Sequence, residues 1–169
     1  MALNLLSPVA NVHRRDFEVS DSGMVDPDDS THLQAGEWVG LDSSGQLQEA
    51  GDDIAGTYPV GGEGPFYQVF SQRGDTAAQA LGKMTVIMSH DYEAETDMYL
   101  TGGTYAVGTL LTLSNGSTGA GGTGDTTRNI LSPWNAVADM VVGVVTLPAS
   151  ATNSGLLRFQ KVSPYFQTT

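Results

Sequence analysis

Acidic side chains hold most of the positions that could do chemistry in this sequence. Asp91, Glu93, Glu95 and Asp97 stand at every second position, so in a β-strand all four carboxylates lie on one face. Such a ladder offers the oxygen ligands that Ca²⁺ prefers, for example at a subunit junction. A solvated strand face, or an edge charged against aggregation, is the simpler alternative, and we favour it.

The remaining candidate groups do not combine into a reaction centre. The acidic group at 26–29 with His32 lacks the glycine and distal glutamate of a calcium-binding loop, so we interpret it as a solvated turn. His90 beside Asp91 has the make-up of a general base, but no nucleophile stands at a recognisable spacing. Some carboxylate pair is expected by chance among 19 acidic residues, so a hydrolase is the weakest alternative. We expect no enzyme activity, no metal site and no cofactor.

The overall composition narrows the classes of partner. The 7 basic and 19 acidic residues give a net charge of −12, which would repel a nucleic-acid backbone or an anionic membrane. No apolar stretch approaches the ~20 residues of a membrane span, and the N-terminus lacks the basic region of a signal peptide. The sequence has no cysteine, so disulfides and thiolate chemistry are excluded. We expect a soluble protein with neither nucleic acid nor membrane as its partner.

The first 35 residues differ from the rest of the chain. They alternate poorly, and they carry apolar side chains such as Leu5, Leu6, Val9 and Val12. We predict an extended N-terminal arm over residues 1–35, whose apolar side chains are buried by a neighbouring subunit. A strand of the chain's own sheet is the alternative.

Residues 36–169 read as one all-β domain, a sandwich or a small barrel, because short β-prone runs alternate there with turn residues. Strands are expected at 37–41, 46–48, 54–60, 66–70, 83–88, 104–108, 110–113, 140–147 and 156–162, the last of them ended by Pro164. At most one or two short helices are expected, at 75–82 and after Pro133.

Two connections carry distinct signals. Asp42 to Gly45 predicts a hairpin turn, because glycine tolerates a positive φ and the aspartate can accept a hydrogen bond from the backbone two residues on. The glycine-rich tract at 116–125 predicts a loop that becomes ordered only against a partner.

Three stretches, 35–42, 104–112 and 141–145, resemble the head decoration (capsid cement) proteins of tailed bacteriophages. The resemblance covers residues 35–166. It lies in the general character of these β-strand and turn sequences, and it includes no catalytic motif. It implies a small β-barrel or β-tulip domain on the outside of an icosahedral shell, present as a dimer or trimer. Such a protein is made in the host cytoplasm, becomes part of the virion and clamps neighbouring subunits of the major capsid protein. Many copies bound to the expanded shell would shift its stability by mass action.

If this interpretation holds, the interface draws on the apolar leader and on exposed side chains. The residues expected there are Leu5, Leu6, Val9, Val12, Arg14, Arg15 and Trp134. The two arginines give a local positive point on an acidic molecule. The alternative function is a carbohydrate- or cell-surface-binding β module of a virion tail or adhesin, with Trp38, Trp134 and the tyrosines as a sugar platform. Core or interface packing is the simpler role for these aromatic side chains.

Overall fold

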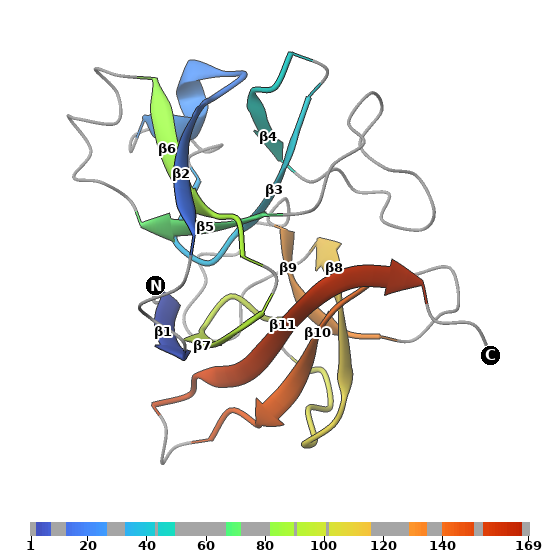
Figure 1. The fold of residues 1–169 in the computed structure, drawn as a ribbon. Helices are drawn as coiled ribbons and strands as arrows, with labels where there is room; N and C mark the ends of the chain where they lie inside the picture. Colours follow the sequence, from blue (N-terminus) through green and yellow to red (C-terminus); the bar gives the residue numbers. More distant parts are fainter. Residues whose placement is uncertain are drawn as a thin grey trace.

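The computed structural model describes residues 3–7, 13–26, 33–42, 44–49, 67–71, 82–89, 91–100, 102–115, 129–134, 140–150 and 154–166. These ranges form eleven β-strands and one short 3-10 helix, arranged as two antiparallel sheets (Figure 1). The predicted all-β class is confirmed. Within the described ranges, neither sheet closes into a barrel through continuous strand pairing. Among the described residues, no helix is both long and apolar enough to cross a membrane.

Sheet A has six strands in the order β1-β7-β11-β10-β8-β9. Their bounds are β1 Leu3–Ser7, β7 Tyr92–Thr96, β11 Leu157–Phe166, β10 Met140–Leu147, β8 Leu110–Asn115 and β9 Asn129–Pro133. The sheet curls, because Tyr99, just beyond β7, forms an isolated parallel bridge with Leu131 of β9. The segment that follows β7, the second strand in this order, thus lies beside β9, the last strand.

Sheet B has five strands in the order β2-β6-β5-β3-β4. Their bounds are β2 Arg14–Glu18, β6 Lys83–Ile87, β5 Tyr67–Ser71, β3 Trp38–Leu41 and β4 Leu47–Glu49. This sheet also curls, since Val19 after β2 bridges to Leu47 of β4. The 3-10 helix η2 (Ser22–Val25) follows, and the Asp21 side chain caps it by accepting a hydrogen bond from the Gly23 N–H at 2.9 Å.

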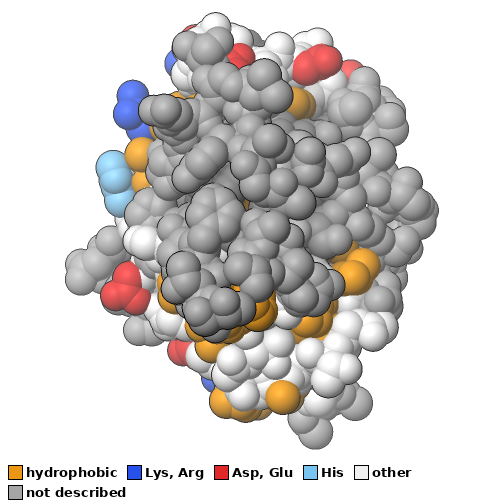
Figure 2. Space-filling model, turned by 90° about the vertical axis from the view of Figure 1, so that its right-hand side faces the viewer, with side chains coloured by type: hydrophobic (Ala, Val, Ile, Leu, Met, Phe, Trp, Pro, Cys, Tyr) orange, Lys and Arg blue, Asp and Glu red, His pale blue; other side chains and the backbone are white. Residues whose placement is uncertain are grey.

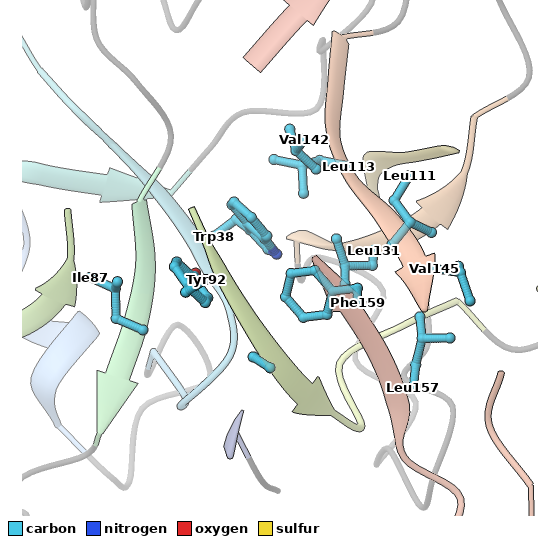
Figure 3. Close-up of a cluster of buried hydrophobic side chains, with 11 residues drawn as sticks. Trp38, Ile87, Tyr92, Leu111, Leu113, Leu131, Val142, Val145, Leu157 and Phe159 are labelled. Atoms are coloured by element: carbon cyan, nitrogen blue, oxygen red, sulfur yellow. The ribbon is translucent and has the colours of Figure 1, made fainter. Parts of the chain in front are cut away.

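Strands β3 and β6 of sheet B bury side chains on both faces, and the two-residue period of a strand decides which side chains face which layer. Trp38 and Ile87 belong to the core shared with sheet A, which is centred on residues such as Phe159 (Figure 3). Their neighbours Val39 and Val86 belong to a second core that includes residues of η2. The junction between the sheets is therefore made of side chains from both of them.

The prediction of an extended N-terminal arm is wrong for the described part of residues 1–35. Leu3–Ser7 pairs with β7 as the outer strand of sheet A, and Arg14–Glu18 pairs with β6 in sheet B. Leu3 and Leu5 pack, partly buried, against the core of sheet A. Leu3 and Leu5 are thus partly buried by their own chain, and a strand of the chain's own sheet is the alternative that the sequence left open.

Two strand predictions need correction. Residues 104–108 form a loop with a turn at 107–108 instead of a strand. The glycines at 102 and 108, with φ of +84° and +87°, bend the chain where β-prone residues alone favour a strand. Strand β11 continues past Pro164 to Phe166. Beyond Lys161 it pairs with β10 and not with β7, and a strand paired on one side tolerates proline.

The predicted hairpin turn is confirmed. Asp42 Oδ1 accepts hydrogen bonds from the N–H groups of Ser44 (2.8 Å) and Gln46 (2.9 Å), and Gly45 has a φ of +78°. Several other predictions fall outside the described residues: the strand at 54–60, residues 75–81 of the expected helix, the loop at 116–125 and the helical turn expected at 135–138.

Candidate functional site

Glu93 and Glu95 of the acidic ladder lie on the outer face of β7, as the alternation predicts, but Asp97, just beyond the strand, is buried. Tyr92, Ala94 and Thr96 are fully buried on the inner face, and Glu93 and Glu95 are only partly buried on the other. Strand β7 is an internal strand of sheet A, because β1 pairs with it on one side and β11 on the other. The ladder is therefore a strand face and not a sheet edge.

An ion pair joins the ladder to the next strand. Arg158 of β11 stands directly opposite Glu95 in the strand register. Its Nη2 and Nε atoms lie 2.6 Å and 3.0 Å from the same carboxylate oxygen, Glu95 Oε1. The Glu95 side chain is only 14% exposed, so the Arg158 guanidinium replaces much of the water that would otherwise solvate the carboxylate.

Two further carboxylates of the ladder have neutral partners. Thr146 Oγ1 of β10 donates a hydrogen bond to Glu93 Oε1 at 2.8 Å. Gln160 Nε2 of β11 donates one to Asp91 Oδ1 at 2.6 Å. The first bond joins β7 to β10, two strands away in the sheet, and the second joins the residue just before β7 to the neighbouring strand β11.

These contacts bear on the metal hypothesis. Within the described ranges, no three His, Asp or Glu residues come together in a group able to hold an ion. Carboxylate oxygens of Asp91, Glu93 and Glu95 accept hydrogen bonds from side chains of sheet A, and Asp97 is buried at 8% exposure. The geometry supports the interpretation of the ladder as a polar strand face. His32 and His90, the other candidates for metal or base chemistry, lie outside the described residues.

The most unusual ionisable group of the described chain is Lys161, a residue that sequence reasoning did not single out. Its side chain has no exposed surface and lies between the two sheets. The ammonium nitrogen lies 5.7 Å from the ring centre of Trp38 and 5.8 Å from that of Tyr92, and it donates a hydrogen bond to the Ser89 carbonyl at 3.3 Å. Burial lowers the pKa of Lys161 to about 7.

A short chain of hydrogen bonds crosses the same junction. The Tyr92 hydroxyl donates to Gln68 Oε1 of sheet B at 2.7 Å, and Gln68 Nε2 donates to the Gly36 carbonyl at 3.0 Å. Burial raises the pKa of Tyr92 well above its usual value, so the phenol stays protonated as a donor. A lysine with a pKa near 7 is a potential nucleophile, but this amine is sealed from solvent by the packing. The junction therefore acts structurally, by fixing one sheet against the other.

The residues expected at an interface lie in separate elements. Leu5 and Leu6 are half-buried in β1 of sheet A, and Trp134 is half-buried after β9. Arg14 and Arg15 are exposed on β2 of sheet B. Val9 and Val12 lie outside the described residues.

The two arginines of β2 are each placed over an aromatic ring. The Arg14 guanidinium carbon lies 4.0 Å from the centre of the Phe70 ring, and that of Arg15 lies 4.9 Å from the centre of the Phe17 ring. In Figure 2 a Lys/Arg side chain and a histidine side chain lie near each other on the left-hand rim of the molecule. The stacking holds this basic point in a defined position on the surface.

The sugar-platform hypothesis loses one of its two tryptophans. Trp38 is only 1% exposed, and its ring packs at 6.4 Å from that of Phe159. Trp134 is half-buried, and its backbone N–H donates to the Leu110 carbonyl at 2.8 Å. Core packing, the simpler expectation, is therefore correct for Trp38.

The sequence contains a signal that identifies Lys161 in retrospect. It has the same parity along β11 as Leu157 and Phe159, and both of those side chains are fully buried. Parity alone places the lysine on the inner face. Its charge argues for the surface, and the burial shows that position in the strand overrides residue type here.

Comparison with protein-family models, with curated proteins and with solved structures found no match to this chain. Function must therefore be inferred from the fold and from the side chains described above.

Proposed function

We propose that this chain is a structural protein of a virion, a decoration protein that binds the outside of a capsid shell and stabilises the contacts between major capsid subunits. One observation carries the proposal: the acidic side chains best placed for chemistry form hydrogen bonds and an ion pair within sheet A, and these interactions stabilise the sheet. The ion pair between Glu95 and Arg158 is the clearest case. A β domain stabilised in this way presents a rigid surface to which a partner can bind.

The composition of that surface supports the proposal. Only 15% of the residues are charged, so much of the surface consists of neutral polar and small side chains. A protein that must fit against a shell at many equivalent positions depends on shape and hydrogen bonding, because the cores of protein interfaces are depleted in charge. The two sheets share a common core, and together they form a scaffold that positions the connecting loops.

The carbohydrate-binding alternative has weaker support. Aromatic sugar platforms require exposed rings, and the rings of Trp38 and Tyr92 are buried in the core. The hydroxyl groups of Tyr99 and Tyr105 donate to backbone carbonyls. Trp134 alone among the tryptophans retains a surface on which the alternative can rest.

The proposal is tested by adding the purified chain to capsid shells that lack it. The chain is expected to sediment with expanded shells and to raise their melting temperature as its concentration rises. Saturation at 100 times the dissociation constant corresponds to about 2.7 kcal/mol per site. Unexpanded shells of the same capsid protein are the control and should bind less. Absence of co-sedimentation, with an unchanged melting temperature, would contradict the proposal.

A further inference from the structure

Strand β2 is an end strand of sheet B, and its outer edge is open where the strand begins. The order β2-β6-β5-β3-β4 places β6 on one side of β2 (Figure 1) and, among the described strands, none along the other side of Arg14–Glu18. An isolated bridge joins Val19, beyond the end of β2, to Leu47 of β4. Because this bridge is parallel, β4 continues beside the residues after Val19 and leads away from Arg14. The edge near Arg14 is therefore the accessible part.

The hydrogen bonds around β2 show which backbone groups point to this open edge. The Met88 N–H donates to the His13 carbonyl at 2.8 Å, across the β2–β6 pair. Opposite residues of an antiparallel pair alternate between bonded and non-bonded pairs, so odd-numbered residues of β2 bond to β6 and even-numbered residues face away from it. The Ser20 N–H donates at 2.8 Å to the Leu47 carbonyl on the other side, as this parity requires. The N–H and C=O groups of Arg14 therefore face the open edge.

Two guanidinium groups flank this edge in fixed positions. Successive side chains of a strand point to opposite faces, so Arg14 and Arg15 lie on the two faces of sheet B, and both are exposed. Each lies over an aromatic ring, with 4.0 Å and 4.9 Å between guanidinium carbon and ring centre. A stacked guanidinium keeps its N–H donors at the rim of its plane, where they can bind a carboxylate. Because stacking already orders the two side chains, they lose little entropy when a partner binds.

Neither of these arginines forms an ion pair with a carboxylate of the described residues, although the chain has 19 acidic residues. The ion pair of the described chain joins Arg158 to Glu95 in sheet A. Asp16, the next residue along β2, accepts a hydrogen bond from Thr85 Oγ1. Two fixed cations without carboxylates, in so acidic a chain, are complementary to an anionic partner.

We infer that this edge of β2 binds an extended acidic segment of a partner protein. The segment adds to sheet B as a further strand, its backbone bonded to Arg14 and its carboxylates placed beside the two arginines. Those two carboxylates belong to adjacent residues, because neighbouring residues of a strand point to opposite faces. Glu18, farther along β2, disfavours acidic residues at the other end of the segment.

A nucleic acid does not fit this edge. It has no peptide backbone to pair with a strand, and the net charge of −12 repels its phosphates. The inference holds for any protein that carries such a segment, so its failure leaves the proposed capsid function untouched.

The test is a titration of the full chain against a labelled peptide, followed by fluorescence anisotropy. The probe has about eight residues, valines and threonines with two adjacent aspartates near one end. The wild-type chain is expected to bind it with a dissociation constant of about 100 μM or below. Arg14→Gln and Arg15→Gln should each weaken binding about fivefold, because each removes a charge-assisted contact. Lys83→Gln removes the same charge from an exposed site on β6 and should stay within about twofold of wild type.

Probes methylated on backbone nitrogens separate strand addition from charge attraction alone. In an added strand only alternate residues bond to the neighbouring edge, so methylation of one alternate set should abolish binding and methylation of the other set should preserve most of it. Equal binding of the two methylated probes would overturn the inference.

Three further results would also overturn it. One is the absence of binding to the wild-type chain at about 1 mM probe. Another is wild-type affinity in both arginine variants, shown to be folded by circular dichroism. The third is self-association of the chain that the arginine variants abolish, since this would assign the edge to a second copy.

Discussion

Lys161 of sheet A reaches across the junction to Trp38 of sheet B, with 5.7 Å between its ammonium nitrogen and the centre of the indole ring. Both side chains are buried. The charge state of one lysine is thus coupled to the packing of the two sheets, and this coupling should be visible in the stability of the whole molecule.

The free energy of unfolding is expected to rise as the pH is raised from about 7 to 9. The pKa of Lys161 is about 7 in the folded chain and 10.5 as the ordinary value, so in this window the unfolded chain holds a proton that the folded chain has lost. Stability then rises with pH, by at most about 1.4 kcal/mol per pH unit. Urea unfolding at several pH values measures this slope. Above pH 10 the raised pKa of Tyr105 acts in the opposite direction, so the window ends there.

Lys161→Met should remove most of that slope. Methionine fills a similar volume without a charge, and replacing a buried charge with an apolar side chain is often neutral or stabilising. The variant should therefore be at least as stable as wild type at pH 7. A loss of several kcal/mol at pH 7, with the slope retained in the variant, would show that the lysine is not the group responsible.

The ion pair on the outer face should contribute modestly to stability. Arg158 retains 36% side-chain exposure, and exposed pairs contribute up to about 1 kcal/mol. A double-mutant cycle with Glu95→Gln and Arg158→Met is expected to give a coupling energy of about 0.5–1 kcal/mol that falls in high salt. A coupling energy of zero at low salt would mean that the contact at 2.6 Å has no energetic role.

Gly36→Ala should destabilise the chain more than Gly45→Ala does. Both glycines have a positive φ, +96° and +78°, so both substitutions strain the backbone. A Cβ at Gly36 would lie 2.9 Å from Thr96 Oγ1, but at Gly45 it would meet no atom within 4 Å. We expect a loss of about 1 kcal/mol at Gly45 and a clearly larger one at Gly36. Equal losses in thermal unfolding would rule out the steric part of this account.

The two tryptophans should respond differently to truncation. Trp38 is buried in the core, so Trp38→Ala should cost about 3–5 kcal/mol of stability. Trp134 is half-buried, and Trp134→Ala should cost less than half as much. Denaturant titrations of the two variants compare them directly. A larger loss at Trp134 would reverse the assignment of core and surface.

Local patterns in the sequence were sufficient for several elements. The turn from Asp42 to Gly45 forms as expected because its hydrogen bonds join residues close together in the chain. The two faces of β7 follow from strict alternation, since a strand has a fixed period of two residues. The all-β class and the two faces of β7 depend on local sequence patterns, and both were predicted correctly.

Long-range pairing was not available from the sequence. Nothing near Leu5 indicates that it lies opposite Ala94, far away in the chain, so the sequence alone favours an arm there. Residues 104–108 have β-prone side chains, but the glycines around them and the anchoring of Tyr105 by Leu100 set a turn. Lys161 was missed because its burial depends on rings supplied by both sheets.

Electron cryomicroscopy of purified virions that contain this chain tests the central claim most directly. The expected map shows the two-sheet body on the outer surface of the capsid, at repeated positions where major capsid subunits meet. Density for the body at the tail alone, or no density outside the shell in particles shown by mass spectrometry to contain the chain, would contradict the claim.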